Sequence, residues 1–257
     1  MALFDELLGS GDGGGVPPMP SVTTGKVVEN WDDKHPGMVR VEIFLGESGQ
    51  NETDWIRVAQ PYAGKGCGSY FLPEVGDEVV LGFNQGDRNH PLVIGSLWNQ
   101  VDTLPEETAR EKNDVKRIKT KGGHELVFTE ESGKETLTLH TPGKLTLTMA
   151  DEKKLITVQD ADGKNLVVID GDKGTVTVTA EKKLLLDVGS GSLLLDGQGK
   201  KATLKMDTIN IEANQNLNLK GQNVKLDGSM MKINSSGNLE AKAGGILTLK
   251  GSMTKIN

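Results

Sequence analysis

Few residues of this chain have the types and spacing that a catalytic site requires. Cys67 is the single cysteine and lies among glycines, far in sequence from any plausible base. The chain has no GxSxG stretch, no HExxH stretch and no paired cysteines. The histidines are scattered, and surface or turn roles are the default for each: His35, His90, His124 and His140. We therefore expect no catalytic site, no metal site and no cofactor.

Two further stretches superficially resemble ligand-binding loops. DADGKN at 160–165 has the acidic start of a calcium loop, but the EF-hand spacing requires glycine at position six and glutamate at position twelve. Those positions are Asn165 and Gly171, so we interpret the stretch as a turn between strands. The glycines of GKGCG at 64–68 lack the following helix of a phosphate loop and predict a flexible barrel loop.

Short alternating segments dominate the second half of the chain. From Thr129 to Asn257 there is no Phe, Tyr or Trp, and no proline follows Pro142. Triplets of apolar, polar and apolar residues recur between turn residues, as expected of strands with one buried face. The clearest are LTL at 137–139 and 145–147, ITV at 156–158, VTV at 176–178, INI at 209–211, LNL at 217–219, VKL at 224–226, MKI at 231–233 and LTL at 247–249.

The repeat length predicts a narrow wound fibre. The first residues of successive triplets are seven or eight residues apart from 209 onward, and roughly nine to eleven residues apart between 145 and 203. Both steps are too short for a propeller blade or a leucine-rich repeat. A single chain would bury only two apolar side chains per strand, too few to offset an ordering cost of about 1 to 2 kcal/mol per residue. The chain is therefore expected to wind with copies of itself.

The absence of aromatic residues favours three copies. Around a common axis each inward position meets its two symmetry mates, where aliphatic side chains fit and three rings would overpack. The predicted fold is all-β, an N-terminal barrel followed by an intertwined trimeric triple-stranded β-helix. The predicted trimer core consists of Ile209, Ile211, Leu217, Leu219, Val224, Leu226, Met231, Ile233, Leu247 and Leu249.

Charge and hydropathy exclude other classes of protein. The 257-residue chain has a net charge of −7, and residues 1–100 hold 6 Lys and Arg against 14 Asp and Glu. Neither half carries a basic nucleic-acid surface. Asp5 and Glu6 stand where a signal peptide would need basic residues and an apolar run, and no segment is apolar enough for a membrane helix. Synthesis in the cytoplasm is expected, with any exit by another route.

The first hundred residues are predicted to form a flexible N-terminal segment followed by a small domain. Residues 1–21 are a flexible segment, in which GSGDGGGVPPMP at 9–20 is the linker. Residues 22–100 contain five strand-like runs separated by turns, which match a closed barrel of the oligonucleotide/oligosaccharide-binding (OB) type. Residues 101–128 are a neck, and 129–257 the shaft with a blunt C-terminal tip. Two interpretations remain for Leu3, Phe4, Leu7 and Leu8: a segment that docks on a neighbouring hub protein, or a disordered leader.

Two stretches carry a family resemblance. WIRVAQPYAG at 55–64 and FLPEVGDEVVLGFNQGDRNHPLVIGSLWN at 71–99 resemble the barrel of the valine-glycine repeat protein G (VgrG) and phage baseplate spike family, which includes proteins like baseplate assembly protein V. The continuation at 117–170 is similar to the neck and first β-helix turns of that family. The resemblance implies the central spike of a contractile injection machine in a phage tail, a tailocin, a type VI secretion system or an extracellular contractile system, where the spike is a baseplate component that pierces the target envelope.

Departures from the family narrow this expectation. Only the short segment 1–21 precedes the barrel, so the hub is expected to be a separate protein, with the inner tube as a further partner. The stretch 101–120 is too short for a lysozyme domain, and no histidine follows His140 to bind iron at an apex. A separate PAAR-type tip protein is therefore expected to contact Met253, Thr254, Ile256 and Asn257.

Two alternative functions compete with the spike. A trimeric receptor-binding fibre would end in a globular or aromatic-rich adhesive region. A secreted β-solenoid lyase or hydrolase would need clustered carboxylates and aromatics on its repeat faces. The repeats contain no aromatic residue, which disfavours both.

Overall fold

The computed structural model describes residues 22–44, 51–83, 87 and 89–255, and these residues form strands, turns and bends without a helix. Seventeen strands are present in this described part. The chain divides into two compact units, of which the first contains most of the chain up to Leu185 and the second most of the chain from Thr203 onward. No described helix is long and apolar enough to cross a membrane.

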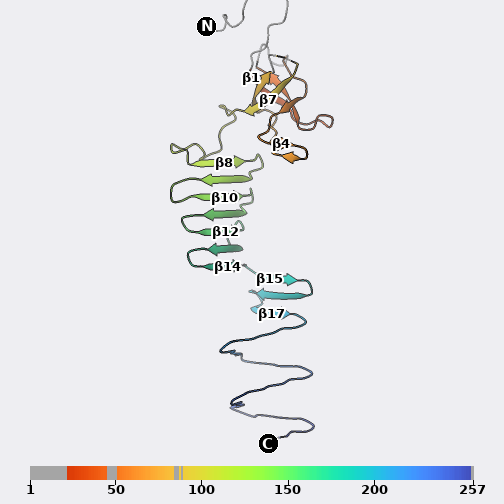
Figure 1. The fold of residues 1–257 in the computed structure, drawn as a ribbon, viewed down its shortest axis with the longest axis vertical. Coiled ribbons are helices and arrows are strands. Elements are labelled where there is room, and N and C mark those ends of the chain that lie inside the picture. The colour runs from red at the N-terminus through yellow and green to blue at the C-terminus, as the bar shows by residue number, and fades with distance from the viewer. Residues whose placement is uncertain (1–21, 45–50, 84–86, 88, 256–257) are drawn as a thin grey trace, which may run out of the picture. The chain divides into compact units, whose positions relative to one another are not determined.

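The first domain is a closed barrel, as the sequence predicts. Its strands are β1 (Val22–Glu29), β2 (Met38–Ile43), β3 (Ile56–Val58), β6 (Glu78–Phe83) and β7 (Pro91–Ser96). They close in the order β1-β2-β3-β7-β6, in which only β3 and β7 are parallel (Figure 1). A small hairpin of β4 (Ala63–Gly64) and β5 (Cys67–Gly68) lies between β3 and β6 in sequence.

The barrel is closed around aliphatic side chains that alternate along its strands. The residues that are fully or almost fully buried are Val27, Val39, Val41, Val79, Leu81 and Val93. Burial of each such side chain stabilises the domain by about 1.5 to 3 kcal/mol relative to exposure. Gly25 is required where β1 approaches β2, because a Cβ there would lie 2.6 Å from the Glu42 carbonyl oxygen.

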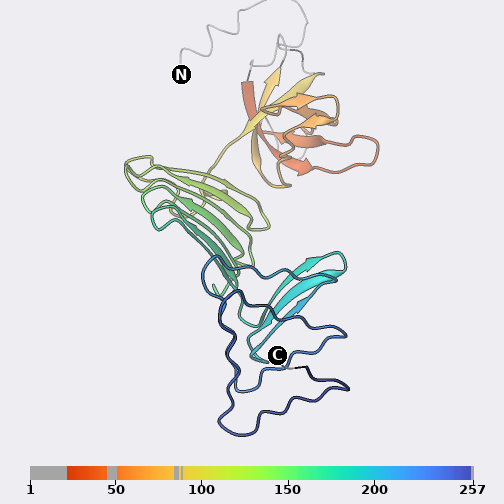
Figure 2. The same ribbon diagram turned by 60° about the horizontal axis from the view of Figure 1, so that its bottom comes forward.

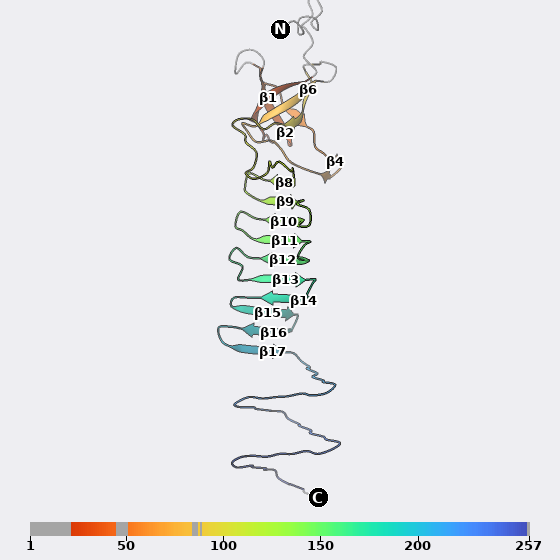
Figure 3. The same ribbon diagram turned by 90° about the vertical axis from the view of Figure 1, so that its left-hand side faces the viewer.

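A seven-stranded antiparallel sheet follows the barrel in sequence. Each strand pairs with the next one along the chain, so the sheet is a simple meander (Figures 2 and 3). The strands are β8 (Val115–Lys119), β9 (Glu125–Thr129), β10 (Thr136–His140), β11 (Thr146–Ala150), β12 (Leu155–Gln159), β13 (Leu166–Asp170) and β14 (Thr175–Thr179). The sheet begins within the segment that the sequence assigns to a neck.

The hairpin turns of this sheet share a backbone feature. Each turn has a residue with positive φ, which glycine adopts at little cost and other residues at a cost of about 1 to 2 kcal/mol. Four turns place glycine there, whereas Lys144 (φ 61°) and Lys154 (φ 46°) occupy the position in the other two. These regular turns fix the register of the five-residue strands.

The register separates the sheet into an apolar face and a polar face. One continuous cross-strand row is aliphatic throughout and consists of Ile118, Leu126, Leu139, Leu147, Val158, Val167 and Val178. The row beside it on the same face holds Phe128, Leu137, Met149, Ile156, Ile169 and Val176. The opposite face is rich in threonine, including Thr138, Thr148, Thr157 and Thr177 in one row.

The rest of the chain contains little regular pairing. A separate three-stranded sheet has the order β15 (Lys183–Val188), β16 (Gly191–Asp196) and β17 (Lys201–Lys205). Residues 206–255, called the tail below, form no strand, and Figure 3 shows no strand arrow after β17. The triplets that the sequence predicts as strands in the tail are thus unpaired in a single chain. A strand exists only where another strand supplies hydrogen-bond partners, and within one chain the tail has no neighbour to do so.

Candidate functional site

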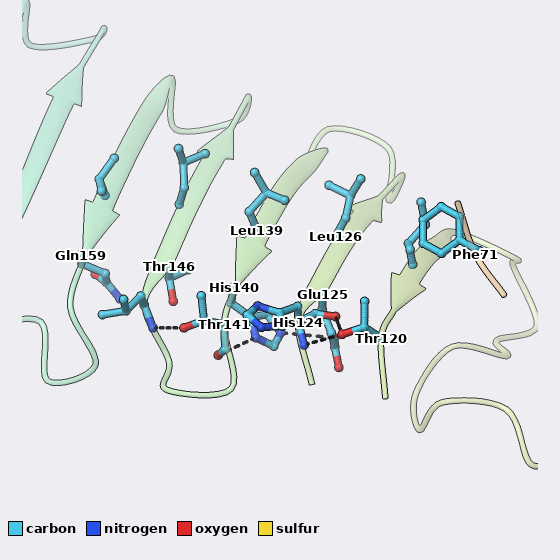
Figure 4. Close-up of a pocket in the computed structure, with 14 residues that line it drawn as sticks. Phe71, Thr120, His124, Glu125, Leu126, Leu139, His140, Thr141, Thr146 and Gln159 are labelled. Carbon is cyan, nitrogen blue, oxygen red and sulfur yellow. Dashed lines mark hydrogen bonds and ion pairs between the residues drawn. The ribbon is translucent and has the colours of Figure 1, made fainter. Parts of the chain in front are cut away.

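The apolar face of the meander sheet borders a hollow that is lined mainly by apolar side chains. It has a volume of about 480 Å³ and is bordered by Phe71 of the barrel domain and by Ile118, Leu126, Leu139, Leu147 and Val158 of the sheet (Figure 4). Several of these side chains are poorly covered, with Leu139 44% and Val158 47% exposed. Large exposed apolar surfaces of soluble proteins are typical of contacts with other macromolecules.

The polar residues at one end of the hollow are used by the hairpin turns. The Thr120 hydroxyl accepts a hydrogen bond from the backbone N–H of His124 at 3.1 Å. The Thr141 hydroxyl accepts one from the backbone N–H of Leu145 at 3.2 Å. Figure 4 shows both bonds beside the rings of His124 and His140. These hydroxyls therefore stabilise turns, and neither is paired with a base that would activate it as a nucleophile.

Glu125 is the most enclosed carboxylate near this end of the sheet. Its side chain is 8% exposed and lies 2.7 Å from Lys119 Nζ, 3.2 Å from His140 Nε2 and 3.5 Å from Arg117 Nε. The hydrogen bond from Lys119 is the main cause that lowers the pKa of Glu125, and the charge of Arg117 acts in the same direction. A carboxylate held ionised in this way joins β8, β9 and β10 and is a poor general acid.

This pairing predicts an acid-sensitive contribution to stability. Because the folded pKa of Glu125 is below its ordinary value of 4.5, its contribution is present above about pH 4.5 and is lost as the pH falls through the folded pKa. We expect Glu125→Gln to be less stable than wild type at pH 7 and to show a smaller further loss between pH 5 and pH 3. Denaturant unfolding at each pH measures this.

The matched control is Glu130→Gln, since the Glu130 side chain is 59% exposed and its one ion pair, with Lys116, is solvated. The pH profile of this control should follow that of wild type. Identical pH profiles for Glu125→Gln and wild type would contradict the assigned role of Glu125.

Of the residues considered for chemistry, only His124 and His140 come together in the described part of the chain, at one end of the hollow, and the others lie apart in structural roles. Cys67 is exposed, and its Sγ lies 3.3 Å from the hydroxyl of Tyr62 across the β4–β5 hairpin. In the 160–165 stretch the Asp160 carboxylate accepts hydrogen bonds from the backbone N–H groups of Lys164 and Asn165. The carboxylate oxygens thus stabilise a turn between β12 and β13, as the sequence predicts.

The histidines lie in different elements. In the barrel domain, His35 stacks on Trp55 with ring centroids 5.6 Å apart and pairs with Asp32. His90 pairs with Asp87. Among the described residues no group of three or more His, Cys, Asp or Glu side chains could hold a metal ion.

The predicted trimer core consists of the apolar residues at the first and third positions of the tail triplets. All ten are poorly covered in the single chain, between 46% and 73% exposed: Ile209, Ile211, Leu217, Leu219, Val224, Leu226, Met231, Ile233, Leu247 and Leu249. The LTL, ITV and VTV triplets of the meander sheet carry the same alternation, and their apolar residues form the apolar face of that sheet, which the predicted trimer core did not include.

The terminal residues assigned to partners are only partly described. Met253 is 86% exposed, and Thr254 is exposed as well. Ile256 and Asn257 lie outside the described residues. So do the four residues assigned to hub docking, which are Leu3, Phe4, Leu7 and Leu8.

Comparison with known proteins gives one family model and several similar proteins. A family model of the injector OB domain of type VI secretion systems and phage baseplates matches residues 23–98, which contain the closed barrel. The type VI secretion system spike protein VgrG1a of Pseudomonas aeruginosa is 33% identical over 134 residues, which are 48% of this chain and 21% of that protein.

Two proteins of Vibrio cholerae are also similar. The type VI secretion system spike protein VgrG3 is 35% identical over 97 residues, 36% of this chain and 10% of its own length. The actin cross-linking toxin VgrG1 is 29% identical over 115 residues, 42% of this chain and 10% of its own length. The chain thus spans about a fifth or less of these relatives.

Proposed function

Because the chain belongs to the family of VgrG and phage baseplate spike proteins, we propose that it is the central spike of a contractile injection machine. In this role the chain is a structural component of the baseplate and catalyses no reaction. Its barrel belongs to the injector type, and its remaining residues build a shaft from three copies. Sheath contraction would drive the shaft through the envelope of a target cell.

The observation that carries this proposal is the unpartnered tail. Each of residues 206–255 is exposed, and these described residues form no backbone-to-backbone hydrogen bond with one another or with the rest of the described chain. Exposed apolar side chains along alternating segments are unfavourable in water, and open strand edges pair readily with further strands. Copies of the same chain would supply those strands, because each has the same alternation.

The repeat of the tail supports three copies. GSMMKIN at 228–234 recurs as GSMTKIN at 251–257, and the triplets of the tail step by seven or eight residues. One such repeat therefore holds three strand segments, as needed to pass once around a three-sided shaft. Neighbouring strands lie about 4.7 to 4.9 Å apart. On each face of the shaft, one strand from each of the two other copies would lie between successive turns of the first chain, so that every strand has a hydrogen-bonded neighbour.

The apolar face of the meander sheet is consistent with the same assembly. Three copies of this face around one axis would cover the exposed rows that contain Leu139, Val158 and Val178. Covering apolar surface contributes about 25 cal/mol per Å².

Stiffness follows from this construction. Each layer of the shaft would be tied by backbone hydrogen bonds on all three faces, and the axis would be filled by aliphatic side chains. Bending such a rod requires breaking many hydrogen bonds at once. A rod of this kind transmits axial force from the contracting sheath without buckling.

Two protein partners complete the proposal. A separate hub protein would hold the barrel end, where Leu3, Phe4, Leu7 and Leu8 are candidate contacts, and the inner tube would lie beyond it. A PAAR-type protein would cover the C-terminal end of the shaft. The competing proposal of a receptor-binding fibre has less support, since the tail contains no aromatic residue for an adhesive surface.

Deletion of residues 1–100 tests the proposed function. We expect this variant to be absent from assembled baseplates, because the deletion removes the barrel, while its shaft still forms trimers. Mass spectrometry of purified contractile particles measures incorporation, and full-length protein is the control. Recovery of the truncated shaft in intact particles at the wild-type level would contradict attachment through the barrel.

A further inference from the structure

The part of the tail after Glu212 differs in charge from the rest of the chain. Residues 213–255 contain six lysines against two acidic residues, Asp227 and Glu240, a net charge of +4. The whole chain carries −7, so the remaining residues carry −11. The lysines are Lys220, Lys225, Lys232, Lys242, Lys250 and Lys255, and all are exposed. They are called the tail lysines below.

The tail lysines also differ in their surroundings. Within the described residues only Lys225 of this set forms an ion pair, at 2.8 Å from Asp227. In the meander sheet, by contrast, lysines are commonly paired with a carboxylate, for example Lys134 with Glu131, Lys154 with Asp172 and Lys164 with Glu181. The lysine charge in the sheet is locally compensated, whereas that of the tail is largely free.

The tail lysines occupy the polar positions of the alternating pattern, between or directly after the apolar residues. Lys225 and Lys232 stand between the two apolar residues of a triplet, and Lys220 and Lys250 directly follow one. Successive side chains of a strand point to opposite faces, so lysines in these positions point outward when the apolar residues point to the axis. In the proposed trimer, three copies would display 18 lysines and a net charge of +12 on the outer surface.

We infer that the outer surface of the tail binds the anionic phospholipid surface of a membrane, an inference that rests on the proposed trimeric spike. Clusters of four to eight basic residues bind anionic bilayers, and each is worth about 1 kcal/mol near the surface. Such binding would hold the C-terminal end of the spike against the target membrane before the shaft is driven through it.

The residue types favour phospholipid over nucleic acid. The tail has no arginine, whose planar fork recognises phosphate in a fixed geometry, and no aromatic side chain on which bases stack. Lysine is a flexible point charge that suits a fluid layer of headgroups. The tail therefore has the charge that a phospholipid surface attracts and lacks the groups that read nucleic acid.

Vesicle binding by the full-length trimer tests the inference. The probes are vesicles of phosphatidylcholine alone and vesicles with 30% phosphatidylglycerol at about 100 mM salt, near the ionic strength at which exposed charges are screened beyond about 10 Å. The variant is Lys220→Gln with Lys232→Gln and Lys250→Gln. The control is Lys134→Gln with Lys154→Gln and Lys164→Gln, which removes the same charge from paired lysines.

We expect wild type to bind the anionic vesicles and to bind the neutral ones at least about tenfold more weakly, because the binding energy is electrostatic. The tail variant should lose about tenfold or more in affinity for anionic vesicles, and the control should stay within about twofold of wild type. Equal loss in both variants would show that only net charge matters and would overturn the inference.

Two further outcomes would also overturn it. One is anionic-vesicle binding by the tail variant at the wild-type level, and the other is tighter binding of wild type to duplex DNA than to anionic vesicles at the same salt concentration. Native mass spectrometry of each protein keeps this test separate from the proposed function. A monomeric wild type contradicts the trimeric spike, whereas a trimeric wild type with no preference for anionic vesicles contradicts only the lipid inference.

Discussion

Leu219→Asp is expected to abolish assembly of the shaft. Leu219 is 68% exposed in a single chain and belongs to the apolar phase of the tail, so in the trimer three aspartates would meet at the axis. The effective cost of burying one unpaired ion is several kcal/mol, and three like charges close together repel one another. Light scattering should therefore find monomers or irregular aggregates in place of trimers.

Asn218→Asp is the matched control for this change. Asn218 is the preceding residue in sequence and lies on the opposite phase of the same triplet. Its side chain would point outward, where an aspartate stays hydrated, so this variant should remain trimeric. A trimeric Leu219→Asp variant, or equal disruption by both changes, would contradict the assignment of the apolar phase to the axis.

Removal of residues 251–257 is expected to release the tip protein. Residues 251–255 form no strand in the single chain and are exposed, including the apolar side chain of Met253, at a cost in free energy in water. A partner that completes the sheet relieves this cost. We expect the truncated spike to remain trimeric, to lose the PAAR-type protein during co-purification, and to support little injection.

A pair of single substitutions refines this test. Met253 in the last repeat corresponds to Met230 one repeat earlier, and the two are 86% and 90% exposed. Met253→Asp should weaken retention of the tip, whereas Met230→Asp, away from the end, should leave it unchanged. Retention of the tip at wild-type affinity by the truncated spike would refute this account of the C-terminus.

Much of the fold could be predicted because alternation identifies strands directly. The barrel strand β6 alternates buried and less buried residues with strict period two, and the runs that contain β1, β2 and β7 are bounded by glycine or proline. In the meander sheet, the LTL and ITV triplets lie on adjacent paired strands. In both cases the hydrogen-bond partners come from the same chain, so local pattern and local pairing agree.

In the tail, alternation alone does not predict the structure of a single chain. Its triplets, such as LNL at 217–219, have the same pattern as those of the sheet, yet they form no strand in a single chain. Alternation predicts a strand that pairs with a neighbouring strand on each side and buries one of its faces. It does not indicate whether the neighbouring strands come from the same chain or from another copy. The lack of aromatic residues and the recurrence of GSMMKIN as GSMTKIN argue for three copies from composition and spacing alone.

The chemical detail of the sheet was less predictable. The approach of Lys119 and His140 to Glu125 depends on the register of β8, β9 and β10, and one residue of slippage would move Glu125 to the other face. The lengths and backbone geometry of the hairpin turns set that register. Sequence patterns identified the turns but did not fix which side chains they bring together.

Native mass spectrometry of the full-length protein tests the central claim most directly. An intertwined spike is expected as a single species with three times the 27.5 kDa mass of one chain. That species should persist at protein concentrations where a weak complex dissociates, because the chains are wound around one another. A stable, folded species with the mass of one chain would contradict the account.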